Sequence, residues 1–83
     1  MQQRKLLIKL LNGSYHNVRF SEFQGLLKSF GFSLARISGS HHIYIHADLR
    51  DIVNIQNVKG HVKPYQIRQV LKLIEQYNLR LEE

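Results

Sequence analysis

The sequence contains no cysteine and no tryptophan, and its 83 residues include a single proline. Without cysteine, the chain can form neither a disulfide framework nor a thiolate metal site, so its core must be built from aliphatic residues and phenylalanine. A chain of this length lies near the lower limit of what folds on a hydrophobic core alone. The lack of cysteine agrees with a reducing compartment, and we expect a cytoplasmic protein.

Long apolar runs are also missing. The run Leu6-Leu7-Ile8 is ended at once by Lys9, and no other stretch is long enough to span a bilayer or to form the apolar part of a signal peptide. We therefore expect no membrane partner. Because no internal repeat, linker or low-complexity tract interrupts the chain, we expect one domain over residues 1–83.

Acidic residues are scarce, since six Asp and Glu face twelve Lys and Arg, for a net charge of +6. The excess is uneven: residues 1–46 hold six basic residues and one acid, whereas residues 47–83 hold six and five. A basic balance favours a polyanionic partner. Nucleic acid fits better than a membrane surface, because no segment combines a basic face with a large exposed apolar one.

Apolar spacing predicts a helix over residues 2–11, ended by Asn12-Gly13-Ser14. A second helix is predicted to begin at Phe20-Ser21, with Ser21 capping and Gln24 closing a capping box.

Two glycines belong to this second helix. Gly31 is placed to end it. Gly25 weakens it and predicts that another element packs close there. A third helix is predicted over residues 64–78, with Pro64 in its first turn, and residues 79–83 are expected to fray.

Strand patterns cover residues 32–37, 41–46 and 52–56, and the short connections between them favour an antiparallel meander. The predicted fold is α+β, a two-layer sandwich in which a three-stranded antiparallel sheet carries helices on one face.

Alternation along the strands predicts which side chains share a face. We expect Ile43, Ile45, Val53 and Ile55 to lie under the helices. The opposite, solvated face then holds His42, Tyr44, His46, Asn54 and Gln56. Exposed, polar and next to a basic half, that face is a candidate RNA surface.

The run Gly39-Ser40-His41-His42-Ile43-Tyr44 resembles the HicA toxin family of bacterial toxin–antitoxin pairs. The resemblance extends over residues 20–79 and leaves residues 1–14 as an extra N-terminal helix. Members often carry His-Pro after the second strand and Pro-x-His after the third. In this chain those places read His46-Ala47 and Val58-Lys59-Gly60-His61.

This resemblance implies the α-β-β-β-α topology of double-stranded RNA-binding domains, here preceded by the extra helix. It also implies a metal-independent endoribonuclease that cleaves mRNA, arrests translation and needs no cofactor. The expected protein partner is a HicB-like antitoxin, which we predict to meet the basic half of the chain with an acidic or apolar surface.

Ribonucleases that work without a metal commonly use the 2′-hydroxyl of RNA as nucleophile, and histidine can accept or donate the protons at neutral pH. The family pattern points first to His41, whereas strand alternation favours His42; both remain candidates. Tyr44 and His46 are candidate RNA contacts, although cross-strand packing explains them equally well.

Cationic side chains near the motif could hold phosphates, and Ser40 could orient a phosphate or cap the turn. The candidates are Arg36, Lys59, Lys63 and Arg68.

A metal site is not predicted, because His42 and His46 stand more than about 10 Å apart on a strand. Two other functions stay open: a non-catalytic RNA-binding module of the same topology, and a domain that binds DNA or only protein.

Overall fold

The computed structural model describes residues 2–82 and contains three helices and three strands. Met1 and Glu83, which the expected domain includes, lie outside the described residues. The order of the helices and strands along the chain is α1 (Gln2–Leu11), α2 (Phe20–Ser29), β1 (Phe32–Ser38), β2 (His41–His46), β3 (Val53–Gln56) and α3 (Pro64–Gln76). This order confirms the predicted α+β fold.

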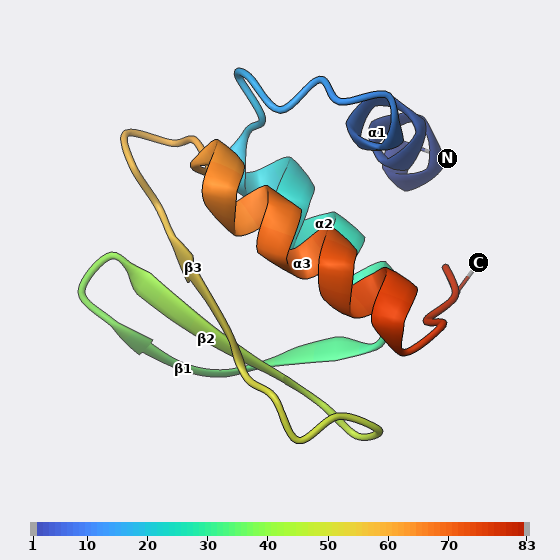
Figure 1. Cartoon of the computed structure of the whole chain (residues 1–83). Helices are drawn as coiled ribbons and strands as arrows, with labels where there is room; N and C mark the ends of the chain where they lie inside the picture. Colours follow the sequence, from blue (N-terminus) through green and yellow to red (C-terminus); the bar gives the residue numbers. More distant parts are fainter. Residues whose placement is uncertain (1, 83) are drawn as a thin grey trace.

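The three strands form one antiparallel sheet in the order β1-β2-β3, and the helices lie on one side of it (Figure 1). Helix α2 lies against β1 and α3 against β3, whereas α1 packs against α2 on the side away from the strands. The β1–β2 turn lies at one end of the molecule, and α1 and the C-terminal tail lie at the other.

Helix α2 begins at Phe20, so the predicted Ser21 cap and capping box are wrong. Arg19 occupies the N-cap without a side-chain hydrogen bond. The Phe20 N–H donates instead to the carbonyl of Gly60, at 2.8 Å. The Gln24 side chain does not close a capping box, because it donates to the Tyr44 hydroxyl. Gly31 follows the helix at φ +93°, as predicted for a residue that must adopt the left-handed region.

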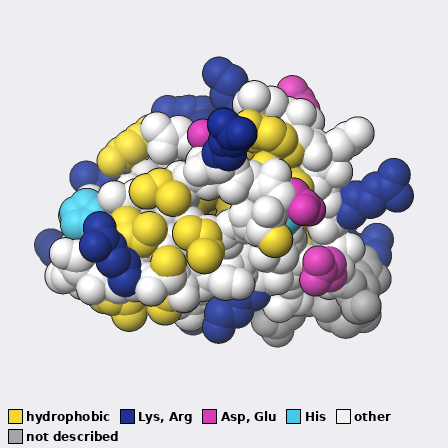
Figure 2. All heavy atoms as spheres, turned by 90° about the horizontal axis from the view of Figure 1, so that it is seen from below, with side chains coloured by type: hydrophobic (Ala, Val, Ile, Leu, Met, Phe, Trp, Pro, Cys, Tyr) yellow, Lys and Arg dark blue, Asp and Glu magenta, His cyan; other side chains and the backbone are white. Residues whose placement is uncertain are grey.

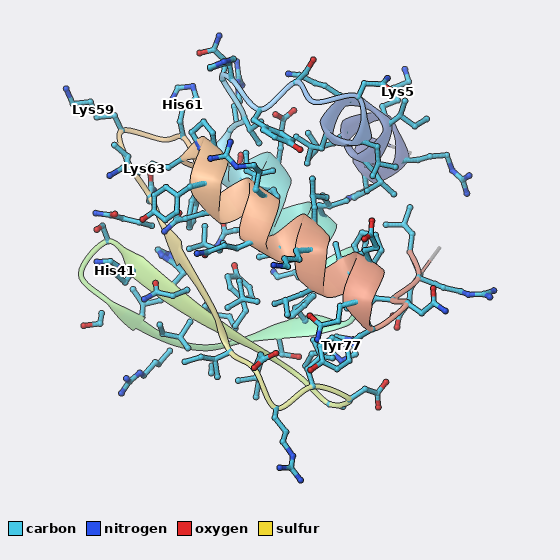
Figure 3. The ribbon with its side chains drawn as sticks, in the orientation of Figure 1. Lys5, His41, Lys59, His61, Lys63 and Tyr77 are labelled. Atoms are coloured by element: carbon cyan, nitrogen blue, oxygen red, sulfur yellow. The ribbon has the colours of Figure 1, made fainter. Side chains whose placement is uncertain are left out.

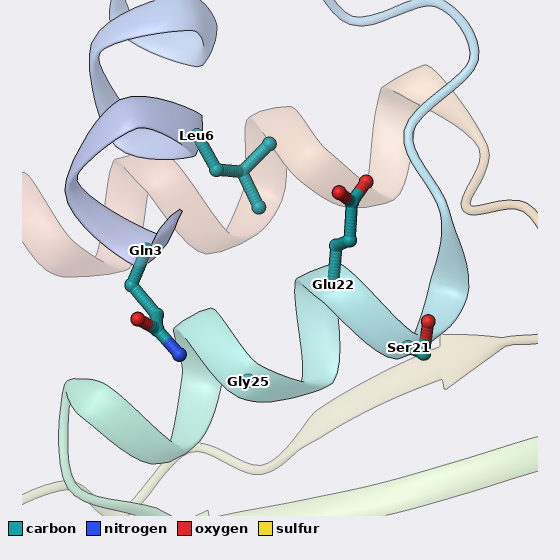
Figure 4. A pocket seen from close by; sticks show the side chains of 5 residues that line it. All are labelled: Gln3, Leu6, Ser21, Glu22 and Gly25. Atoms are coloured by element: carbon teal, nitrogen blue, oxygen red, sulfur yellow. The ribbon is translucent and has the colours of Figure 1, made fainter. Parts of the chain in front are cut away.

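Helix α1 packs against α2 where Gly25 lacks a side chain. The Gln3 amide nitrogen lies 3.4 Å from the position that a Cβ on Gly25 would take (Figure 4). An element thus packs next to Gly25, as predicted, but this distance is an ordinary van der Waals contact and does not by itself require glycine. The side chain of Leu10 is completely buried and belongs to the same core as α2 and α3.

The faces of β2 are the reverse of those predicted. Tyr44 is fully buried on the side facing the helices, opposite Val53 of β3, and Ile45 on the other side is 46% exposed. His42 and His46 share the helix-facing side with Tyr44, and both are half-buried. The expected burial of Val53 and Ile55 is confirmed, whereas the expected burial of Ile43 and Ile45 is wrong, since Ile43 is only half-buried.

Hydrogen-bond partners on the helix-facing side of the sheet explain why Tyr44 and His46 lie on that side of β2. The Tyr44 hydroxyl accepts a hydrogen bond from the Gln24 side chain at 2.7 Å. His46 donates through Nε2 to the Phe30 carbonyl at 2.9 Å and accepts at Nδ1 from the Asp48 N–H at 3.0 Å. Because each polar group finds a partner, these large rings can fill the core at little desolvation cost, and the isoleucines take the outer face.

A β-bulge in β1 determines where Arg36 points. The register changes between Leu34, which pairs with Tyr44, and Arg36, which pairs with Ile43. The extra residue, Ala35, shifts the alternation by one position. Arg36 is therefore on the outer face of the sheet, whereas an unbroken strand would aim its guanidinium at the helices.

The tail after α3 is attached to the domain, so the expectation that it frays is wrong for the described residues 79–82. Helix α3 ends at Gln76, two residues before the predicted end. Leu79 and Leu81 pack against the core, and the Glu82 N–H donates to the Ser29 carbonyl at 2.6 Å.

Candidate functional site

The turn between β1 and β2 is fixed by bonds to the segment that follows β3. Gly39 lies at φ +60°, which favours glycine. The carbonyl of Ser40 accepts from the Asn57 N–H at 2.9 Å, and the Ser40 hydroxyl accepts from the Gln56 side chain at 3.3 Å. Ser40 therefore holds the turn in place.

His41 is exposed on the outer face of the sheet. Its Nδ1 lies 3.1 Å from Oδ1 of Asn54 on the neighbouring strand. Because a carbonyl-type oxygen can only accept, this bond places the ring proton on Nδ1 and leaves Nε2 with the lone pair. His41 is thus a surface histidine with one free ring nitrogen.

His42 points to the other side, toward the helices. Its ring meets the ring of Phe20 edge-on, with centroids 4.6 Å apart, and its Nδ1 lies 3.3 Å from the Ser40 carbonyl. That acceptor again places the proton on Nδ1, so Nε2 of the neutral ring is the nitrogen able to accept a proton. His42 is half-buried and held by an aromatic contact that His41 lacks.

A basic loop, residues 57–63, adjoins His42 through Phe20. The backbone of Phe20 is bonded to Gly60, and Val62 donates to the Val18 carbonyl at 3.0 Å. Lys59, His61 and Lys63 are all exposed on this loop. In Figure 3 these three side chains and His41 lie at the same end of the molecule.

Two of the predicted RNA contacts lie on the side of the sheet that faces the helices. Tyr44 has no exposed surface, and burial raises the pKa of its phenol, an effect that the Gln24 hydrogen bond partly offsets. Both ring nitrogens of His46 are already bonded to the backbone. The prediction that these two residues lie on a solvated face is therefore wrong, and cross-strand and helix packing accounts for them.

The two predicted arginines are not part of the basic loop. Arg68 lies with its guanidinium 5.8 Å from the centre of the Tyr15 ring, in a groove beside α1. Arg36 belongs to the outer face of the sheet. Seen from that side, hydrophobic side chains gather in the middle of the face, with Lys and Arg side chains around them (Figure 2).

Other kinds of site find little support in the described part of the chain. Within residues 2–82, no three His, Asp or Glu side chains come together as metal ligands would. No helix described there is long and apolar enough to cross a membrane. A hollow of about 200 Å³ between α1 and α2 is lined by Gln3, Leu6, Ser21, Glu22 and Gly25, away from the histidines (Figure 4).

Two residues that position the site were missed by reasoning from sequence. Phe20, which joins His42 to the basic loop, was assigned only to a helix start. Gln66 of α3 is 5% exposed, and its side-chain oxygen accepts from the Gln56 N–H at 3.0 Å, which ties β3 to α3. The sequence pattern placed Gln66 outside the apolar stripe of this helix, whereas the structure buries it next to Ile67.

Comparison with protein families gives one match. The model described as the HicA toxin of bacterial toxin–antitoxin systems matches residues 20–76, more than half of the chain. These residues run from the first residue of α2 to the last residue of α3, so α1 and the C-terminal tail lie outside the match. No curated protein and no solved structure matches the chain.

Proposed function

The chain belongs to the HicA toxin family of bacterial toxin–antitoxin systems, and we propose that it is an endoribonuclease that cleaves mRNA and thereby arrests translation. Its partner is a HicB-like antitoxin that neutralises it. The observation that supports a catalytic site best is the position of His42, which packs against Phe20 beside the basic loop.

His42 is the proton-transfer residue in this proposal, although the family motif alone ranked His41 first. A catalytic imidazole works best when its orientation is fixed and cationic groups stand near the phosphate. The Phe20 ring and the Ser40 carbonyl hold His42, and the Phe20 backbone is bonded to the loop that carries Lys59 and Lys63. His41 faces the other side of the sheet, where Asn54 holds it.

The reaction follows from these positions. Nε2 of His42 accepts the proton of a ribose 2′-hydroxyl, and the 2′-oxygen forms a bond to phosphorus. The bond from phosphorus to the 5′-oxygen breaks, and that oxygen takes up a proton from a water molecule of the solvent. Lys59 and Lys63 stabilise the negative charge on the phosphoryl oxygens. Because the nucleophile is the 2′-hydroxyl, DNA of the same sequence is not cleaved.

The test is cleavage of an RNA oligonucleotide by purified protein in EDTA, with His42→Ala and His41→Ala compared. Removing an acid–base residue lowers the rate by about 10²–10⁴-fold, so we expect this loss in His42→Ala and less than about a tenfold loss in His41→Ala. Circular dichroism of both variants checks that each remains folded.

The outcomes separate the possible functions. Equal cleavage by the wild type and both variants would exclude a histidine mechanism. A large loss only in His41→Ala would transfer the proton-transfer role to the outer face. Binding of RNA without cleavage by any of the three proteins would identify a non-catalytic RNA-binding module.

A further inference from the structure

A groove of about 750 Å³ lies between α1, α3 and the C-terminal tail. Helix α1 and the tail lie at the opposite end of the molecule from the β1–β2 turn (Figure 1). Each of these elements supplies apolar side chains to it. They are Leu7 and Leu11 of α1, Leu71 and Ile74 of α3, and Leu79 and Leu81 of the tail. Two of the three elements, α1 and the tail, lie outside the residues that match the family.

The apolar surface of the groove is open to solvent. Leu11 on α1 is 67% exposed, although a helix in a small domain normally turns its leucines inward. The charged side chains that line the groove are mostly cationic: they are Arg68, Lys72 and Arg80, with one acid, Glu75. An apolar floor with a positively charged rim is therefore available to a partner.

We propose that this groove binds an amphipathic helix of a partner protein, one that carries acidic residues beside an apolar stripe. A groove bordered by helices accepts a further helix through apolar residues spaced at i, i+3, i+4 and i+7. Acidic residues flanking that stripe complement the three cations of the rim. This inference goes beyond the nuclease and does not depend on it, because the groove holds none of the residues assigned to cleavage.

The observations favour a protein over the other polyanionic partners. RNA binds through phosphate contacts and stacking, whereas half of the residues that line this groove are leucine or isoleucine, and Tyr15, the aromatic next to Arg68, is half-buried. A membrane would meet protruding apolar residues on a basic face, but here the apolar side chains line a hollow. A helix can enter that hollow along its length.

The experiment titrates the ¹⁵N-labelled full chain with a synthetic 18-residue helical peptide that has leucine at the i, i+3, i+4 and i+7 positions and glutamate elsewhere. A peptide with lysine in place of glutamate is the control for charge. We expect the acidic peptide to shift the amide resonances of α1, the outer face of α3 and residues 78–82, and the lysine peptide to leave them unchanged. A single-stranded RNA oligonucleotide and anionic phosphatidylserine vesicles are titrated in parallel.

Two pairs of variants locate the binding site. Leu11→Glu places a charge inside the groove, whereas Ile8→Glu alters the same helix at a residue that is 54% exposed and does not line it. Lys72→Glu removes a rim cation, and Lys5→Glu changes an exposed lysine of α1 outside the groove. We expect the first variant of each pair to weaken peptide binding by about tenfold or more and the second to leave it within about twofold.

Several results would overturn the proposal. They are equal binding of both peptides, shifts confined to other surfaces, equal effects within each pair of variants, and groove shifts caused by the RNA or the vesicles in place of the acidic peptide. Cleavage of RNA by Leu11→Glu is measured separately. A chain that cleaves nothing but binds the acidic peptide would contradict the nuclease alone, and the reverse would contradict the groove alone.

Discussion

At the scale of single residues, Tyr44 determines which side of β2 is buried. Its ring fills the centre of the core, and its hydroxyl meets the Gln24 side chain. A phenylalanine at this position would fill the same space but leave the Gln24 amide without its acceptor. The residue thus combines an apolar ring with one obligatory hydrogen bond.

We predict that Tyr44→Phe lowers the free energy of unfolding by about 1 kcal/mol at pH 7, the usual cost of a lost internal hydrogen bond. Burial raises the pKa of the Tyr44 phenol above its ordinary value of 10.0. Above pH 10 the unfolded chain loses the phenolic proton of Tyr44 more readily than the folded chain does. The contribution of Tyr44 to the free energy of unfolding therefore falls as the pH rises.

Urea unfolding at pH 7 and between pH 9 and 11 measures both effects. The wild type should lose more stability than Tyr44→Phe over the alkaline range, because the variant lacks this titrating group. Parallel loss of stability in the two proteins would show that Tyr44 does not contribute to the alkaline decline.

The same residues show where sequence reasoning succeeds and where it fails. Alternation correctly groups His42, Tyr44 and His46 on one side of a strand, since the backbone alone sets that grouping. It cannot say which side is buried, because this depends on Gln24 and on the Phe30 carbonyl, which only the folded chain brings to the strand. Hydrophobicity alone predicted that the isoleucines Ile43 and Ile45 of this strand would be the buried side chains.

At the scale of elements, α1 shows how a segment outside the family match joins the core. Leu10 is fully buried, and its neighbour Leu11 is 67% exposed. Both leucines end the same helix, so they form a matched pair that differs in burial. Helix α1 packs against α2, and Leu10 is the one of the two leucines that joins the core.

We predict that Leu10→Ala lowers the free energy of unfolding by about 2–4 kcal/mol, because it leaves a cavity in the core. Leu11→Ala should change it by less than about 0.5 kcal/mol, since the side chain is mostly in water. Chemical denaturation of both variants tests this pair. Similar values for the two would mean that α1 does not pack against the core as described.

Element positions were largely predictable, whereas contacts between elements were not. The apolar spacing of residues 2–11 and the strand 41–46 agree with the observed bounds, because local periodicity specifies them. The start of α2 was misplaced, since the Phe20 N–H finds its acceptor at Gly60, which lies far away in the sequence. The same bond joins His42 to the basic loop, so this part of the candidate site could not be predicted.

At the scale of the whole molecule, the cations of the basic loop and those of the groove belong to two different surfaces. Lys59 and Lys63 lie on the loop beside His42 (Figure 3), whereas Arg68, in the second turn of α3, lines the groove near α1. The proposed functions of the two surfaces differ in the same way, with RNA at the first and an acidic protein helix at the second. Charge composition predicts a polyanionic partner but cannot assign each cation to one surface.

We predict that Lys63→Ala weakens RNA binding and that Arg68→Ala does not. Each lost phosphate contact should reduce the slope of log affinity against log salt by about 0.7. Fluorescence anisotropy with a labelled RNA oligonucleotide at several salt concentrations measures this slope. Equal losses in the two variants would contradict the assignment of Lys63 and Arg68 to different surfaces.

The central claim is that the imidazole of His42 transfers a proton to or from RNA, and chemical rescue tests it most directly. Cleavage by His42→Ala is measured at increasing concentrations of free imidazole, with His41→Ala under the same conditions. We predict that imidazole restores part of the activity of His42→Ala in proportion to its concentration and leaves His41→Ala unchanged. Cleavage by His42→Ala at the wild-type rate in the absence of imidazole would contradict the claim.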